Sequence, residues 1–287
     1  MSGSPPDPNR RAHIRTMLRA APDGTPRLMA VVNCTPDSFH APSRAMHDVA
    51  VQAALDAWDQ GATWVDLGGE STRPGASPVS EIEELERVLP VIVELRERSD
   101  GLISIDTSKP EVARRCVQAG ADLVNDVSGL RDPEMLAFIT DGRVPVCIMH
   151  MQGTPATMQV DPTYTSVSDE VRSALHATAS TLVEGGHDPD LIALDPGIGF
   201  GKRLEDNLVL LRTDLSDGRR FPVLWGVSRK SMIAHLTGRD ATEDRLHGTL
   251  GVAAHARTSG IDLLRVHDVA PHMDLLRVLS AIEDAVC

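Results

Sequence analysis

The sequence predicts an α/β protein with a (β/α)8 TIM-barrel fold. From Leu28 onward, eight short apolar runs rich in Val, Ile and Leu alternate with longer segments of helical period. Such alternation is typical of βαβ units and a parallel sheet. Eight units within about 260 residues suit a closed barrel, whereas a doubly wound sheet would need a reversal of strand order but not this count.

The expected strands are the apolar runs in chain order. They span residues 28–33, 64–69, 102–106, 123–127, 145–151, 192–197, 222–228 and 263–269. Glycines after the helical segments, such as Gly61, Gly120 and Gly260, are typical of left-handed helix C-caps. This regularity favours a single barrel domain over residues 28–287, preceded by a flexible N-terminal extension over residues 1–27.

The clearest helix is expected at residues 79–99, where acidic residues come early and apolar residues recur at helical spacing. Its predicted apolar face consists of Ile82, Leu85, Leu89, Ile92 and Leu95. Pro90 lies inside this helix and is expected to kink it.

Composition excludes several classes of protein. The 287 residues carry a formal net charge of −13, which argues against general binding to nucleic acid or to an acidic membrane surface. No apolar run approaches the 18 or so residues of a membrane span, and residues 1–27 lack the apolar core of a secretory signal. The four cysteines have no zinc-site spacing. We therefore expect a cytoplasmic protein with reduced thiols.

Polar residues end most of the predicted strands, and in a TIM barrel those ends surround the active site. Asp106, Asn125 and Asp195 end three different strands. Carboxylates and an amide together suit a flat heterocycle with an amidine-like edge. A divalent metal held by the two carboxylates is an alternative, and any one of the three residues could simply cap the following helix.

Cationic residues form a second group at the strand ends. Arg73, Lys202, Lys230 and Arg265 lie at or just after these ends, and arginine in particular suits phosphate. The chain has only three lysines, and all of them fall in such places. Lys109, which precedes Pro110, is interpreted as a residue that begins a helix.

Three further features give weaker signals. The segment GIGFGK at residues 197–202 lacks the spacing of a phosphate loop, and mobility would also explain its glycines. His150 and His267 lie within apolar strands, where a buried structural histidine is as reasonable as a ligand. The sequence indicates no nucleophile with an adjacent base, so covalent catalysis is not expected.

The motifs, taken together, resemble the dihydropteroate synthase family across residues 28–285. They are NCTPDSF, DLGGESTRPGA, IDTSKPEVA, LVNDVSG, PVCIMHMQGTP, LDPGIGFGK, GVSRKSM and LRVHDV. The resemblance implies a pterin-binding TIM barrel, a cytoplasmic homodimer and a sulfonamide target. It also implies condensation of 6-hydroxymethyl-7,8-dihydropterin diphosphate with 4-aminobenzoate in folate synthesis, with diphosphate as the leaving group.

The resemblance also assigns roles to particular residues. The implied pterin site comprises Asp106, Asn125, Met149, Asp195, Lys230 and Arg265. The implied diphosphate site comprises Asn33, Arg73, Arg265 and His267, with Mg²⁺ held by Asn33 and phosphate oxygens. The implied aminobenzoate site comprises Thr72, Pro74, Phe200 and Ser231. In the implied dissociative mechanism, diphosphate leaves first, and Asp106, Lys230, Arg265 and His267 are the catalytic residues.

One loop departs from the family pattern. After NCTPDSF the family commonly continues with Asp-Gly-Gly, whereas residues 40–45 read HAPSRA, with Pro42 where a flexible glycine is expected and Arg44 as a replacement charge. Two alternatives follow from the resemblance. A non-catalytic pterin-binding paralogue would explain the loop. A methyltetrahydrofolate:corrinoid methyltransferase would share Asp106, Asn125 and Asp195, but not the Arg-Lys-Ser and Arg-x-His motifs.

Overall fold

The computed structural model describes residues 7–35, 43–71 and 77–285. Eight parallel strands form one sheet in the order β6-β5-β4-β3-β2-β1-β8-β7. They are β1 (Arg27–Asn33), β2 (Trp64–Gly68), β3 (Leu102–Asp106), β4 (Leu123–Asp126), β5 (Val146–Met149), β6 (Ile192–Asp195), β7 (Leu224–Gly226) and β8 (Leu263–Val266). A parallel bridge between Leu194 and Val223 joins the two outer strands, so the sheet curls into a barrel. The predicted TIM barrel is confirmed.

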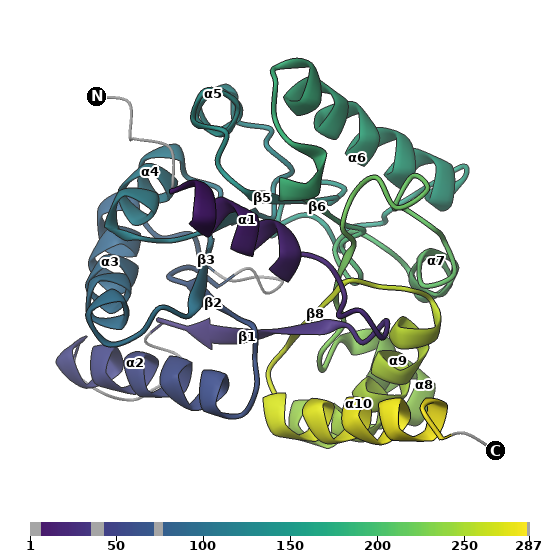
Figure 1. Ribbon diagram of the computed structural model, residues 1–287. Helices are drawn as coiled ribbons and strands as arrows, with labels where there is room; N and C mark the ends of the chain where they lie inside the picture. Colours follow the sequence, from purple (N-terminus) through teal and green to yellow (C-terminus); the bar gives the residue numbers. More distant parts are fainter. Residues whose placement is uncertain (1–6, 36–42, 72–76, 286–287) are drawn as a thin grey trace.

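Helices follow the strands and surround the barrel (Figure 1). They are α2 (Ser43–Asp59), α3 (Glu81–Arg98), α4 (Pro110–Ala119), α5 (Pro133–Gly142), α6 (Val167–Glu184), α7 (Leu204–Leu210), α8 (Ser231–Thr237), α9 (Leu246–Thr258) and α10 (Val269–Glu283), with short 3-10 helices at Pro189–Leu191 and Thr242–Arg245. None of the helices described is long and apolar enough to cross a membrane.

Residues 8–27 are not the flexible extension that the sequence predicted. Helix α1 (Pro8–Met17) lies across the strands, as Figure 1 shows. Ile14 and Leu18 are fully buried at the base of the barrel, and the Trp64 indole Nε1 donates to the Met17 carbonyl oxygen at 2.9 Å. The prediction failed because α1 has few large apolar residues, and the two that it has, Ile14 and Met17, pack inward.

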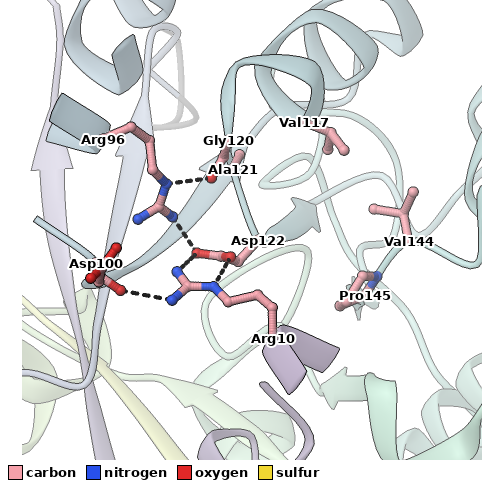
Figure 2. A pocket seen from close by; sticks show the side chains of 9 residues that line it. All are labelled: Arg10, Arg96, Asp100, Val117, Gly120, Ala121, Asp122, Val144 and Pro145. Atoms are coloured by element: carbon pink, nitrogen blue, oxygen red, sulfur yellow. Dashed lines mark hydrogen bonds and ion pairs between the residues drawn. The ribbon is translucent and has the colours of Figure 1, made fainter. Parts of the chain in front are cut away.

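Arginine side chains fasten α1 to the barrel. Both Nε and Nη2 of Arg10 donate to the Asp122 carboxylate at 2.7 Å, and Arg96 of α3 donates to the same carboxylate (Figure 2). A cavity of about 340 Å³ lies beside this cluster, lined in part by Val117 and Val144. The guanidinium groups of Arg10 and Arg96 are all bonded to Asp122 or to backbone carbonyl oxygens, so this cluster has a structural role.

The strands have two faces with different partners. Alternate strand residues point to opposite faces of a sheet. The outward-facing residues pack against the helices in the larger apolar cluster. The inward-facing residues Met29, Trp64, Leu102, Leu123, Cys147, Ala193, Leu224 and Leu263 form a separate cluster with Ile14 and Leu18. Asp66, Asp106, Asn125, Met149, Asp195 and Arg265 lie two or four residues farther along the same strands, so they face inward above this apolar layer.

Helix α3 is confirmed, but its predicted buried face is partly wrong. Ile82 is 69% exposed, and Leu85 and Leu89 are only partly buried. The buried residues are Glu84, Val88, Val91, Ile92 and Leu95. The helix is therefore rotated so that a carboxylate, rather than Ile82, enters the interior. The partner of that carboxylate is Lys109, which no helical periodicity would reveal.

Candidate active site

A cavity of about 480 Å³ opens at the carboxyl ends of the strands. Seven of the predicted site residues line it: Asn33, Asp106, Phe200, Lys230, Ser231, Arg265 and His267. Predicted residues Thr72, Arg73 and Pro74 lie outside the described residues, as does the 40–42 part of the divergent loop. The barrel thus brings together residues that are far apart in the chain, as expected of strand ends in this fold.

Three predicted residues do not line the cavity wall. Asn125, Met149 and Asp195 are buried inside the barrel mouth. Asp195 nevertheless lies next to the cavity, because Gly226 lines it and a Cβ at Gly226 would lie 3.6 Å from Asp195 Oδ2. The missing side chain at Gly226 leaves room for a ligand to approach this carboxylate. Met149 packs with Met151, Met158 and Phe200 in a small apolar cluster.

Arg265 is the centre of the ionic network in the cavity. Its Nε donates to Asp66 Oδ2 at 2.5 Å and its Nη2 donates to Asp106 Oδ2 at 2.7 Å. Asn125 Nδ2 also donates to Asp66 Oδ2, at 3.1 Å. Asp66 therefore orients both Arg265 and Asn125. Asp66 was not among the residues predicted from the sequence, although an aspartate two residues after Trp64 in an apolar strand was a visible signal.

The surroundings of Asp106 make its carboxyl group harder to ionise than it would be in water. Burial raises its pKa to about 7, Arg265 opposes that rise, and repulsion from Asp66 adds to it. The second oxygen, Oδ1, is buried and has no hydrogen-bond partner among the described residues. A buried acceptor of this kind carries a desolvation cost, and a bound ligand that donates a hydrogen bond would remove it.

Lys230 lies at the start of α8 and faces the same cavity. Its Nζ is 3.9 Å from the centre of the Phe200 ring, within the range of a cation–π contact. Burial lowers its pKa to about 8, and attraction to Asp195 limits the fall. In the part of the chain that the structure describes, Lys230 contacts the Phe200 ring and does not form an ion pair with a carboxylate. Its charge is therefore available to a ligand.

Arg229 fixes the position of Lys230 in the loop after β7. Arg229 has a left-handed backbone with φ of 57° and donates to both oxygens of Asp268, from Nε at 2.9 Å and from Nη2 at 2.5 Å. Asp268 begins α10, so this pair ties the loop after β7 to the loop after β8. Ser228 Oγ lies 3.0 Å from His267 Nδ1 and strengthens the same connection. Sequence reasoning did not find a role for Arg229 or Asp268.

The GIGFGK segment is tightly packed rather than loose. A Cβ at Gly197 would lie 2.0 Å from the His150 carbonyl oxygen, and one at Gly201 would lie 2.5 Å from the Gln152 carbonyl oxygen. The glycines therefore let two loops touch backbone to backbone. This arrangement places Phe200 at the cavity.

Lys202 belongs to this packing and not to the cavity, contrary to its grouping with phosphate-binding cations. It is 4% exposed, and its Nζ donates to the Phe200 and His150 carbonyl oxygens at 2.9 and 3.2 Å. Burial lowers the pKa of Lys202 to about 7. Burial, and then the charge of Lys202, lowers the pKa of His150 to about 3, so His150 is a neutral packing residue.

The alternative of a metal between Asp106 and Asp195 finds little support. Asp106 is paired with Arg265, and Asp195 Oδ1 accepts from the Gly197 amide at 2.7 Å. Within the described ranges, no three His, Cys, Asp or Glu residues gather into a possible metal site. The donors instead suit a flat polar ring, with cations nearby for an anionic group. The fold and site thus define a TIM-barrel enzyme that binds a heterocycle and an anion in one cavity.

Comparisons with known proteins identify the family to which the chain belongs. The family described as pterin binding enzyme matches residues 29–267. The Escherichia coli K12 dihydropteroate synthase is 42% identical over 261 residues, which cover 89% of this chain and 91% of the relative. A Xanthomonas albilineans dihydropteroate synthase solved with 4-aminobenzoic acid has a TM-score of 0.82 and 42% identity, covering 91% of this chain and 94% of that one. The same enzyme solved with 7,8-dihydropteroate has a TM-score of 0.83 and 39% identity, covering 93% and 97%. The chain belongs to the pterin-binding enzyme family and, within it, to the dihydropteroate synthases.

Proposed function

We propose that this protein joins 6-hydroxymethyl-7,8-dihydropterin diphosphate to 4-aminobenzoate, giving 7,8-dihydropteroate and diphosphate for folate synthesis. The observation that carries the proposal is the pairing of two opposite features in one cavity. Asp106 presents a buried carboxylate oxygen that has no partner among the described residues, and Lys230 and Arg265 supply positive charge beside it. A reaction that separates a pterin cation from a diphosphate anion needs both.

The pterin is expected to lie in the barrel mouth. Its amidine-like edge would donate to Asp195 and to the carbonyl oxygen of Asn125, whose Nδ2 is turned towards Asp66. Asp106 Oδ1 would accept a further ring N–H, while Lys230 would donate to a ring oxygen or nitrogen. Met149 would pack against the ring, and the Arg265 guanidinium would stack on it.

The diphosphate is expected at the rim, where Asn33, Arg265 and His267 line the cavity. Arg73 is proposed to join them. Asn33 also suits Mg²⁺, which prefers oxygen ligands and often takes one or two from the protein and others from substrate phosphates. When bound, Mg²⁺ would neutralise charge on the departing diphosphate. The aminobenzoate would contact Phe200 and Ser231, which line the same cavity, together with Thr72 and Pro74.

The residues stabilise charge and do not perform covalent catalysis. The C–O bond to diphosphate breaks with its electron pair leaving on the diphosphate, and Asp106 stabilises the delocalised pterin cation. Arg265 and His267 take up the negative charge on the leaving group. The arylamine nitrogen then forms the new C–N bond and loses a proton to water. Because Asp66 and Asp106 hold Arg265 before substrate arrives, little reorganisation is needed.

A product assay tests the proposal. Purified protein, the pterin diphosphate, 4-aminobenzoate and Mg²⁺ should yield equal amounts of diphosphate and dihydropteroate, measured by chromatography. Because the chain is acidic, the assay should cover a range of salt concentrations. Asp106→Asn should lose most activity, since a neutral amide cannot stabilise the cation. Absence of dihydropteroate at every salt concentration would contradict the proposal.

Complementation separates an enzyme from the non-catalytic paralogue. The gene should restore growth to a folate-auxotrophic strain that lacks its own synthase, without folate end-products in the medium. The Asp106→Asn gene serves as the control and should fail. If the protein is instead a non-catalytic paralogue, it should bind pterin in calorimetry, but its gene should not restore growth.

We also propose that the protein is a cytoplasmic homodimer. Three large apolar side chains are exposed on adjacent helices, Leu208 (38%) and Val209 (45%) of α7 and Leu236 (52%) of α8. Exposed apolar side chains on neighbouring helices suit contact with a second copy of the chain. Light scattering after size exclusion should give twice the chain mass of 30.9 kDa, and Val209→Glu should give the monomer.

A further inference from the structure

Lys109 lies between two carboxylates next to the cavity. It starts α4, three residues after Asp106, and its backbone N–H donates to Thr107 Oγ1 at 3.2 Å. Its Nζ makes ion pairs with both Glu70 and Glu84. The sequence explained Lys109 only as a residue that begins a helix, which the structure confirms but which leaves the side chain unexplained.

The two carboxylates differ in surroundings. Glu84 comes from α3 and is 1% exposed, and its Oε1 has no partner among the described residues, so Lys109 is the cation that compensates its charge. Glu70 directly follows the β2–Gly69 segment, is about one quarter exposed, and lines the cavity. Burial alone would lower the pKa of Lys109, but the hydrogen bonds that Lys109 donates to Glu70 and Glu84 raise it above its usual value. Lys109 is therefore always charged near neutral pH.

The backbone before Glu70 is fixed. A Cβ at Gly69 would lie 2.8 Å from Val88 Cγ1, so the chain passes closely over α3. Arg87 Nη1 also donates to the Gly69 carbonyl oxygen at 2.7 Å. Glu70 thus enters the cavity wall at a set place, and the direction of its side chain is decided by Lys109.

An unpaired carboxylate at this place would oppose the proposed substrate. Glu70 shares the cavity with Asn33, Arg265 and His267, where diphosphate is expected. Like charges in a partly buried cavity repel strongly because water screens them poorly. Keeping the Glu70 carboxylate paired with Lys109 therefore matters for anion binding, whereas an uncharged ring in the barrel mouth would be little affected.

We propose that Lys109 is a positioning residue for diphosphate binding, which holds the Glu70 carboxylate against the α3 side of the cavity and away from the diphosphate. Glu84 is the buried anchor that keeps Lys109 in place. The inference rests on the proposed function, because it assumes that the cavity receives a diphosphate. Lys109 would thus act on substrate binding through Glu70, without touching the substrate itself.

The experiment uses inorganic pyrophosphate, with Mg²⁺, and unphosphorylated 6-hydroxymethylpterin as separate calorimetric probes. Lys109→Met alone would leave Glu84 as a buried unpaired charge and endanger folding. The test variant is therefore Lys109→Met with Glu84→Gln, which removes the buried pair, leaves the summed charge of the three residues unchanged and frees Glu70 to turn into the cavity. Addition of Glu70→Gln gives the rescue variant. Arg114→Met is the matched control, because Arg114 is a cation of α4 that pairs with Glu111 on the surface.

The double variant should bind pyrophosphate about tenfold more weakly than wild type. The rescue variant should recover most of that loss, and all proteins should bind the uncharged pterin equally. Arg114→Met should behave as wild type. The inference is overturned if the double variant binds pyrophosphate normally, if Glu70→Gln gives no rescue, or if pterin binding falls in parallel. A wild-type protein that binds pterin but no pyrophosphate would overturn the proposed function and this inference with it.

Discussion

The Lys230 ammonium lies over the Phe200 ring and is the charged end of a residue that begins α8. A compact ammonium has three donors that rotate freely, whereas a guanidinium is a flat and wider group. In the proposed complex Lys230 would stand between the pterin and the aminobenzoate beside Ser231. The compact ammonium fits between the two flat ligands, but the wider guanidinium of an arginine would clash with one of them.

Lys230→Arg should therefore lose activity nearly as badly as Lys230→Ala. We expect kcat/KM to fall by about a hundredfold or more in both variants, as for other lost charge-stabilising groups. Steady-state kinetics with both substrates varied would measure this. Near-normal turnover of Lys230→Arg would show that positive charge alone is sufficient and that the steric argument is wrong.

The pKa of Asp106, which depends on Asp66, should set how activity changes with pH. Asp106 acts as a carboxylate, so activity should fall as pH drops through its pKa of about 7. Since repulsion from Asp66 helps to raise that pKa, Asp66→Asn should move the acidic limb of the kcat/KM profile to lower pH. The maximum should also fall by up to about a hundredfold, because Arg265 loses a partner that orients it.

The matched control for Asp66→Asn is Asp274→Asn, a carboxylate exposed on α10. Its pH profile should coincide with that of wild type. An acidic limb that stays in place in Asp66→Asn, or moves to higher pH, would contradict the assignment of that limb to Asp106.

Residues at strand ends were predictable, whereas their partners were not. Asp106 and Arg265 could be found because a TIM barrel collects its strand ends at one mouth. The bridge from Arg265 to Asp66 joins β8 to β2, and the pair of Arg229 with Asp268 joins two loops. Such contacts depend on the register and the rotation of elements distant in sequence, and no local pattern encodes them.

At the scale of elements, the loop over residues 197–202 offers a test of backbone packing. Gly201 has a φ of 62° and a Cβ there would lie 2.5 Å from the Gln152 carbonyl oxygen. Gly218 has a φ of 66°, but a Cβ there would meet nothing within 4 Å. The two glycines share the conformational requirement and differ in crowding.

Gly201→Ala should thus be worse than Gly218→Ala. Both pay roughly 1–2 kcal/mol for a left-handed alanine, and Gly201→Ala must also separate two loops. We expect it to lower the free energy of unfolding further, by about 1–3 kcal/mol, and to raise the KM for 4-aminobenzoate because Phe200 moves. Urea unfolding and kinetics would measure both. Equal effects of the two substitutions would show that the loops are not in firm contact.

Element type was easier to predict than element orientation. Each of the eight strands was recognised from its apolar run, and the differences at their ends amount to a few residues. The face of α3 was predicted from apolar periodicity alone, but Glu84 turns inward to meet Lys109. A buried ion pair thus overrode a hydrophobic pattern, because the lysine that makes it lies on another element.

At the scale of the whole molecule, the barrel has a catalytic end and a structural end. The candidate site occupies the carboxyl ends of the strands, and α1 closes the opposite end. Arg10, Arg15 and Arg19 of the N-terminal segment pair with Asp122, Asp188 and Asp190, respectively, around the base. Ile14 and Leu18 fill the centre of that base together with Trp64.

This division predicts that α1 affects stability and not catalysis. Ile14→Ala should lower the free energy of unfolding by about 2–5 kcal/mol, because it opens a cavity among side chains that cannot collapse around it. Its kcat and KM at 25 °C should remain those of wild type, since the barrel lies between Ile14 and the site. Ile282→Ala, at a position that is 65% exposed, is the control and should change stability by less than about 0.5 kcal/mol. If Ile14→Ala unfolds in urea like wild type, α1 is not an integral part of the core. If it loses activity without losing stability, the two ends of the barrel are coupled.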